Sequence, residues 1–225
     1  MINFPKVFCV TLKETPKRTE YAHNHFKQHG LDVEFFEGIY GPTFGLKTTI
    51  PNNFENADGS DYFIKSGRIG CFLTHLMLWK TLWHNNYDEI LVLEDDVVLV
   101  ENFKEKLIDI KNRLPVDWQY VFVGHCCLPK LEFQTKIDKG ILSSTQAPMC
   151  THAYLIKKSS IPVLIETNRQ VSAAIDIQIQ KNSLPNLKYY ILNPPLAKQL
   201  SYTKESDKSE INESFESLTL DSKYD

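Results

Sequence analysis

The strongest constraint on this chain is an apolar run that ends in three adjacent carboxylates and then resumes at once. Residues 89–100 read Glu-Ile-Leu-Val-Leu-Glu-Asp-Asp-Val-Val-Leu-Val, so Glu94, Asp95 and Asp96 stand between two β-prone segments. Burying an unpaired carboxylate carries a large desolvation penalty. A turn at the end of a core strand relieves it by presenting the acids to a hard cation such as Mg²⁺ or Mn²⁺, or to a polar ligand. The alternative is a solvated turn without a ligand, but surface turns seldom have apolar runs on both sides, so we favour a site for metal and nucleotide.

Strand-like and helix-like segments alternate along the rest of the chain. Apolar runs predict core strands at 6–12, 33–36, 89–93, 119–124, 150–156 and 189–192. Periodicity and helix-start or helix-stop residues predict helices at 15–29, 67–86, 102–113, 158–167 and 173–181. Residues 131–146 alternate weakly around Gly140, which indicates a hairpin. This order predicts an α/β fold with a mostly parallel central sheet flanked by helices, and ligands at the carboxyl ends of the strands.

The bulk composition is that of a globular protein with a real core, because 42% of the 225 residues are hydrophobic and 24% are charged. The formal net charge of −3 argues against binding driven by nucleic-acid phosphates, so no nucleic-acid partner is expected. The sequence contains neither a signal-peptide pattern nor a stretch of ~20 apolar residues. We therefore expect a cytoplasmic protein. Residues 1–200 are predicted to form a single domain, 201–225 a mobile polar tail, and 43–65 a binding loop, a lid or a disordered segment.

The cysteines and the histidines of the first helix give weaker signals. The number of cysteines is five, which is odd, and no C-x-x-C pair exists, so neither a disulfide framework nor a zinc knuckle is predicted. The adjacent Cys126 and Cys127 are interpreted as small packing residues at a strand end. His23, His25 and His29 could suggest a metal site, but no carboxylate completes a ligand set. We expect a solvated helical face there.

The predicted helix 67–86 is apolar nearly all round, which indicates a central position in the fold. Thr74 and His75 are the polar exceptions near its middle. They could be a satisfied pair in the core or part of a polar cluster that faces a ligand, and their spacing alone favours the core pair.

Several motifs together resemble glycosyltransferase family 25. The strand 7–12 followed by Arg18 is similar to the opening of that family, and Glu37-Gly38-Ile39-Tyr40-Gly41 resembles its next turn. Gly67-x-Ile69-Gly70-Cys71-x-x-Thr74-His75-x-x-x-Trp79 resembles its signature helix, in which Ser more usually occupies position 74, and 91–97 resembles its acidic motif. The downstream match is thinner, and consists of 153–156, Asp176, Pro195 and Gln199. The likeness covers most of positions 6–200, in a family that contains lipooligosaccharide galactosyl- and glucosyltransferases and the collagen galactosyltransferases.

The resemblance implies a GT-A-type nucleotide-diphospho-sugar transferase fold and an inverting reaction. A hexose, with galactose favoured and glucose next, would pass from a UDP-sugar to a saccharide or glycoconjugate acceptor in a β-linkage, with Mn²⁺ or Mg²⁺ as cofactor. An acceptor of this kind could bring the protein to the inner membrane as a peripheral protein.

The same resemblance assigns roles to single residues. Asp96 is the best metal ligand, and Glu94 and Asp95 would contact the metal, a metal-bound water or the donor. His152 is a further candidate metal ligand. Residues expected near the nucleotide or behind the metal are Thr11, Leu12, Arg18, Gly38, Tyr40, Thr74 and His75, which revises the core interpretation of Thr74 and His75.

An inverting reaction needs a general base for the acceptor hydroxyl, and Asp176 is our candidate. It is a lone acid between 173–175 and Ile177, and an apolar environment raises the pKa of a carboxyl group, which makes its carboxylate a stronger base. It could instead be a helix N-terminal acid satisfied by backbone amides. His125 and His152 are further candidates for the base. Two other functions stay open: a catalytically silent sugar-nucleotide-binding or assembly module of the same fold, and a nucleotidyltransferase, which would lack the usual glycine-rich phosphate loop.

Overall fold

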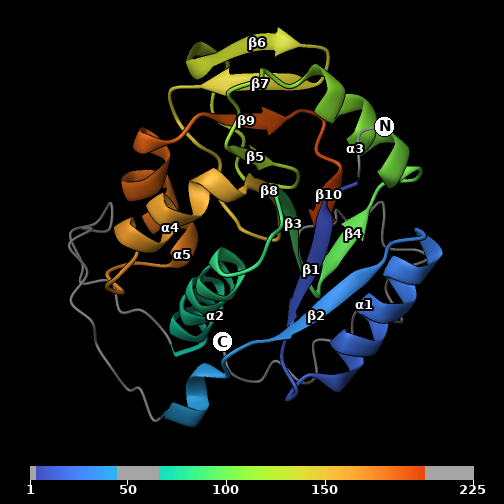
Figure 1. The fold of residues 1–225 in the computed structure, drawn as a ribbon, viewed down its shortest axis with the longest axis vertical. Helices are drawn as coiled ribbons and strands as arrows, with labels where there is room; N and C mark the ends of the chain where they lie inside the picture. Colours follow the sequence, from blue (N-terminus) through green and yellow to red (C-terminus); the bar gives the residue numbers. More distant parts are fainter. Residues whose placement is uncertain (1–3, 45–65, 201–225) are drawn as a thin grey trace.

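A computed structural model of the protein describes residues 4–44 and 66–200, and is built on one large sheet (Figure 1). The eight strands of this sheet have the order β2-β1-β3-β8-β5-β9-β7-β6. Their bounds are β1 Lys6–Thr11, β2 Val33–Glu37, β3 Glu89–Glu94, β5 Tyr120–Phe122, β6 Gln134–Asp138, β7 Ile141–Ser144, β8 Ala153–Lys157 and β9 Tyr189–Leu192. A separate antiparallel ribbon pairs β4 (Val97–Leu99) with β10 (Ala197–Gln199). Most of the predicted loop 43–65 and the whole predicted tail 201–225 lie outside the described residues.

Most strands of the large sheet point the same way. β2, β1 and β3 are mutually parallel, and β5 is parallel to β9. β8 is antiparallel to both of its neighbours, β3 and β5, so those two strands share a direction across it. β7 is antiparallel to β9 and β6, which leaves β7 and β8 as the reversed strands of the sheet. The predicted α/β class with a mostly parallel central sheet flanked by helices is confirmed.

Helices cover both faces of the sheet. α1 (Pro16–Gln28) and α3 (Phe103–Arg113) lie on one face, and α2 (Ser66–Trp83), α4 (Ile161–Thr167) and α5 (Ile175–Gln178) lie on the other (Figure 1). Short 3₁₀ turns include η1 (Gly41–Phe44), and a π-helical turn follows α5. Within the described residues, no helix has the length and apolar character needed to cross a bilayer.

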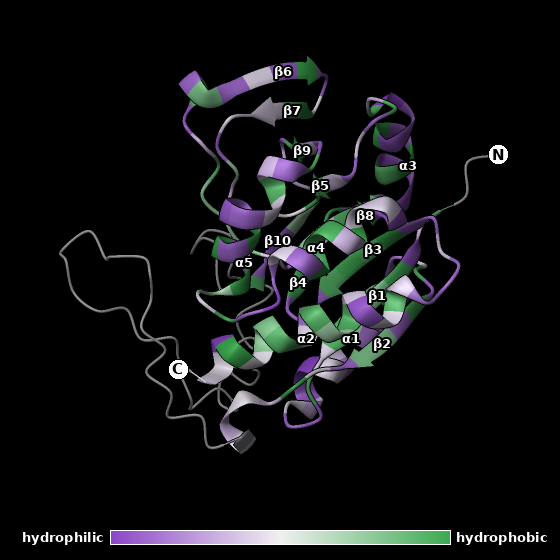
Figure 2. Cartoon of the chain, turned by 60° about the vertical axis from the view of Figure 1, so that its left-hand side comes forward, coloured by the Kyte–Doolittle hydropathy of each residue, from purple (hydrophilic) through white to green (hydrophobic). Residues whose placement is uncertain are grey.

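The alternation of side chains in β3 shows why this strand is central. Leu91 and Leu93 pack into the core beneath α1 and α3, whereas Ile90 and Val92 pack into the core beneath α2 and α4. A strand that is buried on both faces needs apolar residues at every position, because successive side chains point to opposite faces. Figure 2 shows this continuous apolar character on β1, β3 and most of α2, in contrast to the more polar hairpin strand β6. The carboxylates of 94–96 follow directly where the doubly buried segment ends.

Most predicted elements exist within a few residues of their expected bounds. The hairpin expected in 131–146 is β6–β7, and Gly140 adopts a φ of +78° at its turn, a conformation that costs glycine little. Strand β10 was not predicted. It is three residues long and follows two prolines, so its sequence carries no alternation to detect.

Two expectations about side chains were wrong. His25 is half-buried rather than solvated, and its Nε2 accepts a hydrogen bond from the backbone N–H of Leu99 at 2.9 Å. The absence of a disulfide was also wrong for one pair, because Cys126 and Cys150 are joined by a disulfide with Cα atoms 5.7 Å apart. Both contacts join segments distant in sequence, so residue spacing could not reveal them.

Candidate functional site

The acidic residues lie at the carboxyl edge of the sheet, beside the end of β1. The parallel register pairs Val10 of β1 with Glu94 of β3, so Thr11 comes level with Asp95. Asp95 and Asp96 form the turn between β3 and β4. The hydroxyl of Thr11 donates to Asp95 Oδ2 at 3.3 Å, and it also lies 2.6 Å from the hydroxyl of Thr19. The carboxyl ends of parallel strands are where α/β proteins bind ligands.

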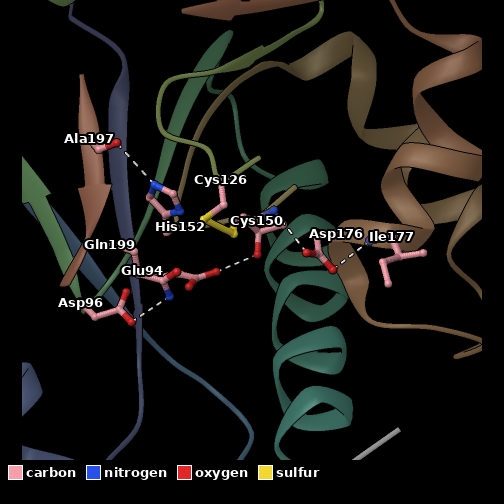
Figure 3. Close-up of a disulfide and its surroundings, with 10 residues drawn as sticks. Glu94, Asp96, Cys126, Cys150, His152, Asp176, Ile177, Ala197 and Gln199 are labelled. Atoms are coloured by element: carbon pink, nitrogen blue, oxygen red, sulfur yellow. Dashed lines mark hydrogen bonds between the residues drawn. A yellow bond between two sulfur atoms is a disulfide. The ribbon is translucent and has the colours of Figure 1, made fainter. Parts of the chain in front are cut away.

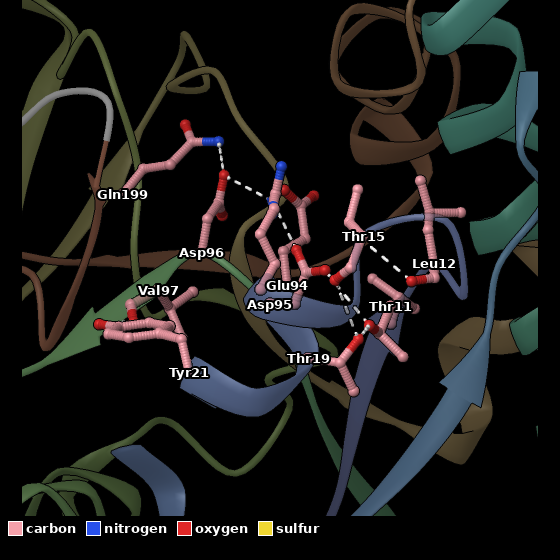
Figure 4. A network of polar contacts seen from close by, with 12 residues as sticks. Thr11, Leu12, Thr15, Thr19, Tyr21, Glu94, Asp95, Asp96, Val97 and Gln199 are labelled. Atoms are coloured by element: carbon pink, nitrogen blue, oxygen red, sulfur yellow. Dashed lines mark hydrogen bonds and ion pairs between the residues drawn. The ribbon is translucent and has the colours of Figure 1, made fainter. Parts of the chain in front are cut away.

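Arg18 supplies the positive charge of this turn, whose residues Asp95 and Asp96 are labelled in Figure 4. It stands in the first turn of α1, which Pro16 begins, and its guanidinium lies 2.5 Å from Asp95 Oδ1 and 3.0 Å from Asp96 Oδ2. Gln199 of β10 donates to the same Asp96 oxygen at 3.0 Å. The other oxygen, Oδ1 of Asp96, is buried and has no hydrogen-bond partner. The cluster therefore retains one acceptor that is available to a ligand.

Burial and mutual repulsion act differently on the three carboxyls. Burial raises the pKa of Asp95 to about 6, although Arg18 opposes the shift. Burial also raises the pKa of Asp96, again against Arg18 and with help from the charge of Glu94. Burial alone would raise the pKa of Glu94, but contacts with His75 and Thr151 and the nearby His152 outweigh it and hold that pKa low. The turn thus concentrates negative charge that a single arginine only partly balances.

The glycine turn after β2 packs closely on α2. Thr74 Oγ1 accepts a hydrogen bond from the backbone N–H of Ile39 and donates one to the carbonyl of Gly70, both at 2.8 Å. A Cβ atom on Gly70 would lie 2.4 Å from the carbonyl oxygen of Ile39, and one on Gly41 would lie 1.8 Å from the carbonyl oxygen of Ser66. The glycines of both segments are therefore required for this close approach.

His75 lies behind Glu94 and is fully buried. Its Nδ1 is 2.9 Å from the hydroxyl of Tyr154, which accepts a hydrogen bond from the indole of Trp79 at 3.0 Å. Its Nε2 lies 3.4 Å from Glu94 Oε1 but does not form a hydrogen bond with it, because the geometry is unfavourable. Thr151 donates to the same Glu94 oxygen at 2.7 Å. His75 is thus a buried core residue that also lines a pocket, together with Glu94.

A pocket of about 270 Å³ opens between these elements. We call it the β1–β3 pocket. It brings together the seven residues that are expected near the nucleotide or behind the metal, and also Glu94 and Asp95, which are expected to contact the metal or the donor: Thr11, Leu12, Arg18, Gly38, Tyr40, Thr74, His75, Glu94 and Asp95.

A second pocket of about 360 Å³, which we call the Asp176 pocket, shares Glu94 and Cys71 with the first. Asp176 lies on its wall and accepts hydrogen bonds from the backbone N–H groups of Cys150 at 3.2 Å and Ile177 at 2.8 Å (Figure 3). The disulfide Cys126–Cys150, Thr151 and Gln199 line the same pocket. Sequence reasoning missed Thr151 and Cys71, since one polar residue before a strand and one cysteine in an apolar helix give no distinctive signal.

The candidate metal ligands do not all come together. Among the described residues, two groups place three or more histidine, cysteine or carboxylate ligand atoms within 4.8 Å of one another: Cys71 with His75 and Glu94, and Cys126 with Cys150 and His152. The predicted combination of Asp96, Glu94 and His152 is not such a group. Of the candidate bases, His125 bonds through Nε2 to the carbonyl of Leu192 at 3.0 Å and does not line the Asp176 pocket.

The arrangement of a glycine turn, a signature helix and an acidic strand end is matched by a known family. Residues 4–179 match glycosyltransferase family 25, described as an LPS biosynthesis protein family. The chain belongs to glycosyltransferase family 25. The motifs from strand 7–12 to Asp176 lie inside the matched segment, whereas Pro195 and Gln199, which also contributed to the resemblance, lie beyond it.

Individual members of the family are distant relatives. A glycosyltransferase 25 family member of Aedes aegypti is 27% identical over 190 residues, which cover 80% of this chain and 31% of that protein. Human procollagen galactosyltransferase 2 is 26% identical over 131 residues, which cover 55% of this chain and 21% of that protein. The chain thus spans a fifth to a third of the length of these relatives. Among solved structures, a glycosyltransferase involved in the glycosylation of the major capsid of PBCV-1 has a TM-score of 0.49 at 11% identity, covering 93% of this chain and 99% of that one.

Proposed function

We propose that this member of glycosyltransferase family 25 transfers a hexose from a UDP-sugar to a saccharide or glycoconjugate acceptor, with inversion to a β-linkage. Galactose is the favoured hexose, because human procollagen galactosyltransferase 2 is among the relatives. The observation that carries the proposal is the convergence on the β1–β3 pocket of nine residues that the family resemblance assigns to the donor or the metal, next to a second pocket that contains Asp176.

The β1–β3 pocket is the proposed site of the donor. The turn Gly38–Gly41 and Leu12 offer backbone and apolar surface of the kind that a uracil ring packs against. Arg18 would exchange part of its contact with Asp95 for the diphosphate, because a guanidinium forms strong bidentate contacts with phosphate oxygens. Thr74 fixes the glycine turn to α2, and so it would hold the nucleotide side of the pocket rather than touch the donor.

The residues of the acidic turn fit a hard divalent cation. Their ligand atoms are carboxylate oxygens, and Asp96 Oδ1 is buried without a partner. We propose Asp96 as the principal ligand of Mn²⁺ or Mg²⁺, with Glu94 and Asp95 close to the ion or its waters. The bound ion would offset the negative charge that develops on the leaving diphosphate.

The Asp176 pocket is the proposed site of the acceptor. Asp176 would take the proton of the acceptor hydroxyl while that oxygen bonds to the anomeric carbon and the bond to the diphosphate breaks. Two backbone N–H groups hold its carboxylate in place. Because Glu94 lines both pockets, acceptor and donor would meet at this residue.

The test is a screen of UDP-sugars with free sugar acceptors and Mn²⁺, read by release of UDP. We expect turnover that falls by at least about 10²-fold in Asp96→Asn, since charge stabilisation at the leaving group is lost. Asp109→Asn is the matched control, because Asp109 is an exposed residue of α3 whose partner is Arg113. Full activity of Asp96→Asn, or full activity in excess EDTA, would overturn the metal-dependent mechanism. Donor binding without turnover of any acceptor would favour the silent binding module.

A further inference from the structure

A cluster of sulfur and nitrogen atoms lies on the wall of the Asp176 pocket, apart from the carboxylates assigned to the donor. Cys126 follows β5, and Cys150 and His152 precede β8. The ligand atoms of the three residues lie within 4.8 Å of one another. We propose that Cys126, Cys150 and His152 form a zinc site when the two cysteines are reduced. This proposal does not depend on the proposed transferase activity.

His152 is prepared to act as a ligand. Its side chain is 1% exposed, and its Nδ1 is buried without any hydrogen-bond partner. Its Nε2 lies 3.4 Å from the carbonyl oxygen of Ala197, which can only accept, so in the neutral ring Nε2 is the donor and Nδ1 keeps its lone pair. Figure 3 shows the other side of the ring turned toward the sulfur atoms. Histidines that bind metals usually have their second nitrogen fixed by a carbonyl or carboxylate in this way.

The position of the ring also requires Gly124. A Cβ atom at this position would lie 2.4 Å from Nε2 of His152 and 2.6 Å from the carbonyl oxygen of Ala197. The absence of a side chain at 124 therefore lets the imidazole and its carbonyl partner come together at the end of β5.

The two sulfur atoms are held together by the backbone as well as by their bond. The N–H of Cys126 donates to the carbonyl of Met149 and the N–H of Met149 donates to the carbonyl of Cys126, both at 3.0 Å. Cys150 itself has a φ of +77°, a conformation that non-glycine residues adopt at a cost. Reduction of the disulfide by a cellular dithiol gives two thiols and an oxidised dithiol, and the two thiols would remain adjacent.

The chemistry of the ligands selects the metal. Two thiolates and an imidazole favour zinc over Mn²⁺ or Mg²⁺, which prefer oxygen ligands, so this site is distinct from the one proposed at Asp96. Zinc binding would release the two thiol protons and leave a fourth position toward the Asp176 pocket, where Cys126 and Cys150 form part of the wall. Cys127 is free and exposed beside Cys126, and Cys9 and Cys71 are free as well, so most of the cysteines are already thiols.

The test is a titration of the full chain with Co²⁺, a spectroscopic substitute for zinc, after reduction with dithiothreitol and its removal without air. We expect thiolate-to-cobalt charge transfer and the visible bands of a tetrahedral ion, both saturating at one cobalt per chain and abolished by Zn²⁺. Cys150→Ser should remove the charge-transfer band, and His152→Gln should weaken binding at least about tenfold. Cys127→Ser, at the neighbouring exposed position, is the matched control and should bind cobalt like the parent.

A second measurement does not need the variants to fold. Zinc should protect Cys126 and Cys150 of the reduced parent chain from alkylation and leave Cys127 reactive, as read by mass spectrometry of the peptides. A reduced chain that binds no cobalt, or that unfolds on reduction, would assign the pair as a structural disulfide and overturn the proposal. An unchanged thiolate band in Cys150→Ser would also overturn it, because the thiolate would come from another cysteine.

Discussion

The two pockets that meet at Glu94 hold their carboxylates in opposite ways. In the β1–β3 pocket, Asp95 is balanced by the side chain of Arg18, which also contacts the neighbouring Asp96. In the Asp176 pocket, the carboxylate of Asp176 is held by backbone N–H groups. A charge balanced by one side chain can be unbalanced by one substitution, whereas backbone donors persist when side chains change.

The pockets also differ in how the chain assembles them. The first is built from the ends of the parallel strands β1 and β3 and from helices α1 and α2, and strand register brings Thr11 level with Asp95. The second draws on the residues after β5, before β8, in α5 and in β10. The comparison teaches that the β1–β3 pocket depends on side-chain charge and the Asp176 pocket on tertiary contacts between distant segments.

Replacing Arg18 should give the largest effect on stability. Arg18→Met leaves two mostly buried aspartates without their cation, so the free energy of unfolding at pH 7.5 should fall by about 3–5 kcal/mol. The loss should shrink toward pH 5, because the raised pKa of about 6 lets Asp95 take a proton there. Urea unfolding of the metal-free protein at the two pH values measures both effects.

Arg113 provides the control, because it also contacts two aspartates, Asp109 at 2.8 Å and Asp138 at 3.3 Å. Its partners are largely exposed, so Arg113→Met should cost less than about 1 kcal/mol. Equal losses of unfolding free energy in the two variants would mean that burial of the Arg18 cluster contributes nothing to stability. The proposed dependence of the β1–β3 pocket on a buried side-chain charge would then be wrong.

Replacing Asp176 should affect turnover more than stability. Asp176→Asn keeps an oxygen for one of the two backbone N–H groups, so the fold should lose about 1–2 kcal/mol. It cannot accept a proton, so turnover should fall at least about 10²-fold, and donor affinity should stay unchanged. Steady-state kinetics, donor binding and urea unfolding separate these quantities.

The opposite pattern would assign Asp176 a different role. If turnover is retained and stability falls, the residue is a helix N-terminal acid that fixes the segment at Cys150. Asp117→Asn is a suitable control, because Asp117 lies away from both pockets and its side chain contacts the hydroxyl of Tyr190.

The contrast between the pockets also explains what could be predicted from sequence. The run 89–96 predicts a central strand followed by a turn, because a strand that is buried on both faces must be continuously apolar and the acidic residues mark its end. The convergence of Thr11 with Asp95 then follows from parallel pairing of the two strands. Local pattern was enough to anticipate the acidic turn, whereas the other residues of the β1–β3 pocket were anticipated through the resemblance to glycosyltransferase family 25.

The Asp176 pocket resisted prediction because its contacts are not periodic. The partner of Cys126 is Cys150, which is 24 residues away and beyond a hairpin. No spacing in the sequence shows that Cys126, rather than the neighbouring Cys127, forms this disulfide. Thr151 bonds to Glu94 only because β8 runs antiparallel beside β3, a reversal that the alternation of strands and helices does not encode. Gln199 comes from a strand too short to detect by pattern.

Replacing His25 should give the smallest effect. It tests whether a titratable side chain helps to hold α1, which carries Arg18, against β4. His25 stands on α1, and its Nε2 accepts from Leu99 of β4. Burial, with a contribution from the charge of His29, lowers the pKa of His25 to about 4. An unfolded histidine titrates near pH 6.5, so the folded chain binds fewer protons between these values. Stability contributed by neutral His25 is therefore complete above about pH 6.5 and is lost as the pH falls through about 4.

The size of this contribution is about 1–2 kcal/mol after allowance for the partial exposure of the ring. His25→Gln offers an uncharged acceptor that cannot titrate, so the difference in unfolding free energy between pH 7 and pH 4.5 should be smaller than in the parent by that amount. The exposed His84 after α2 is the matched control, and His84→Gln should leave the parent's pH dependence intact. If His25→Gln and the parent lose equal stability on acidification, protonation of His25 does not weaken the contact between α1 and β4. Arg18 would then be the one charged group shown to stabilise the β1–β3 pocket differently from the backbone-held Asp176 pocket.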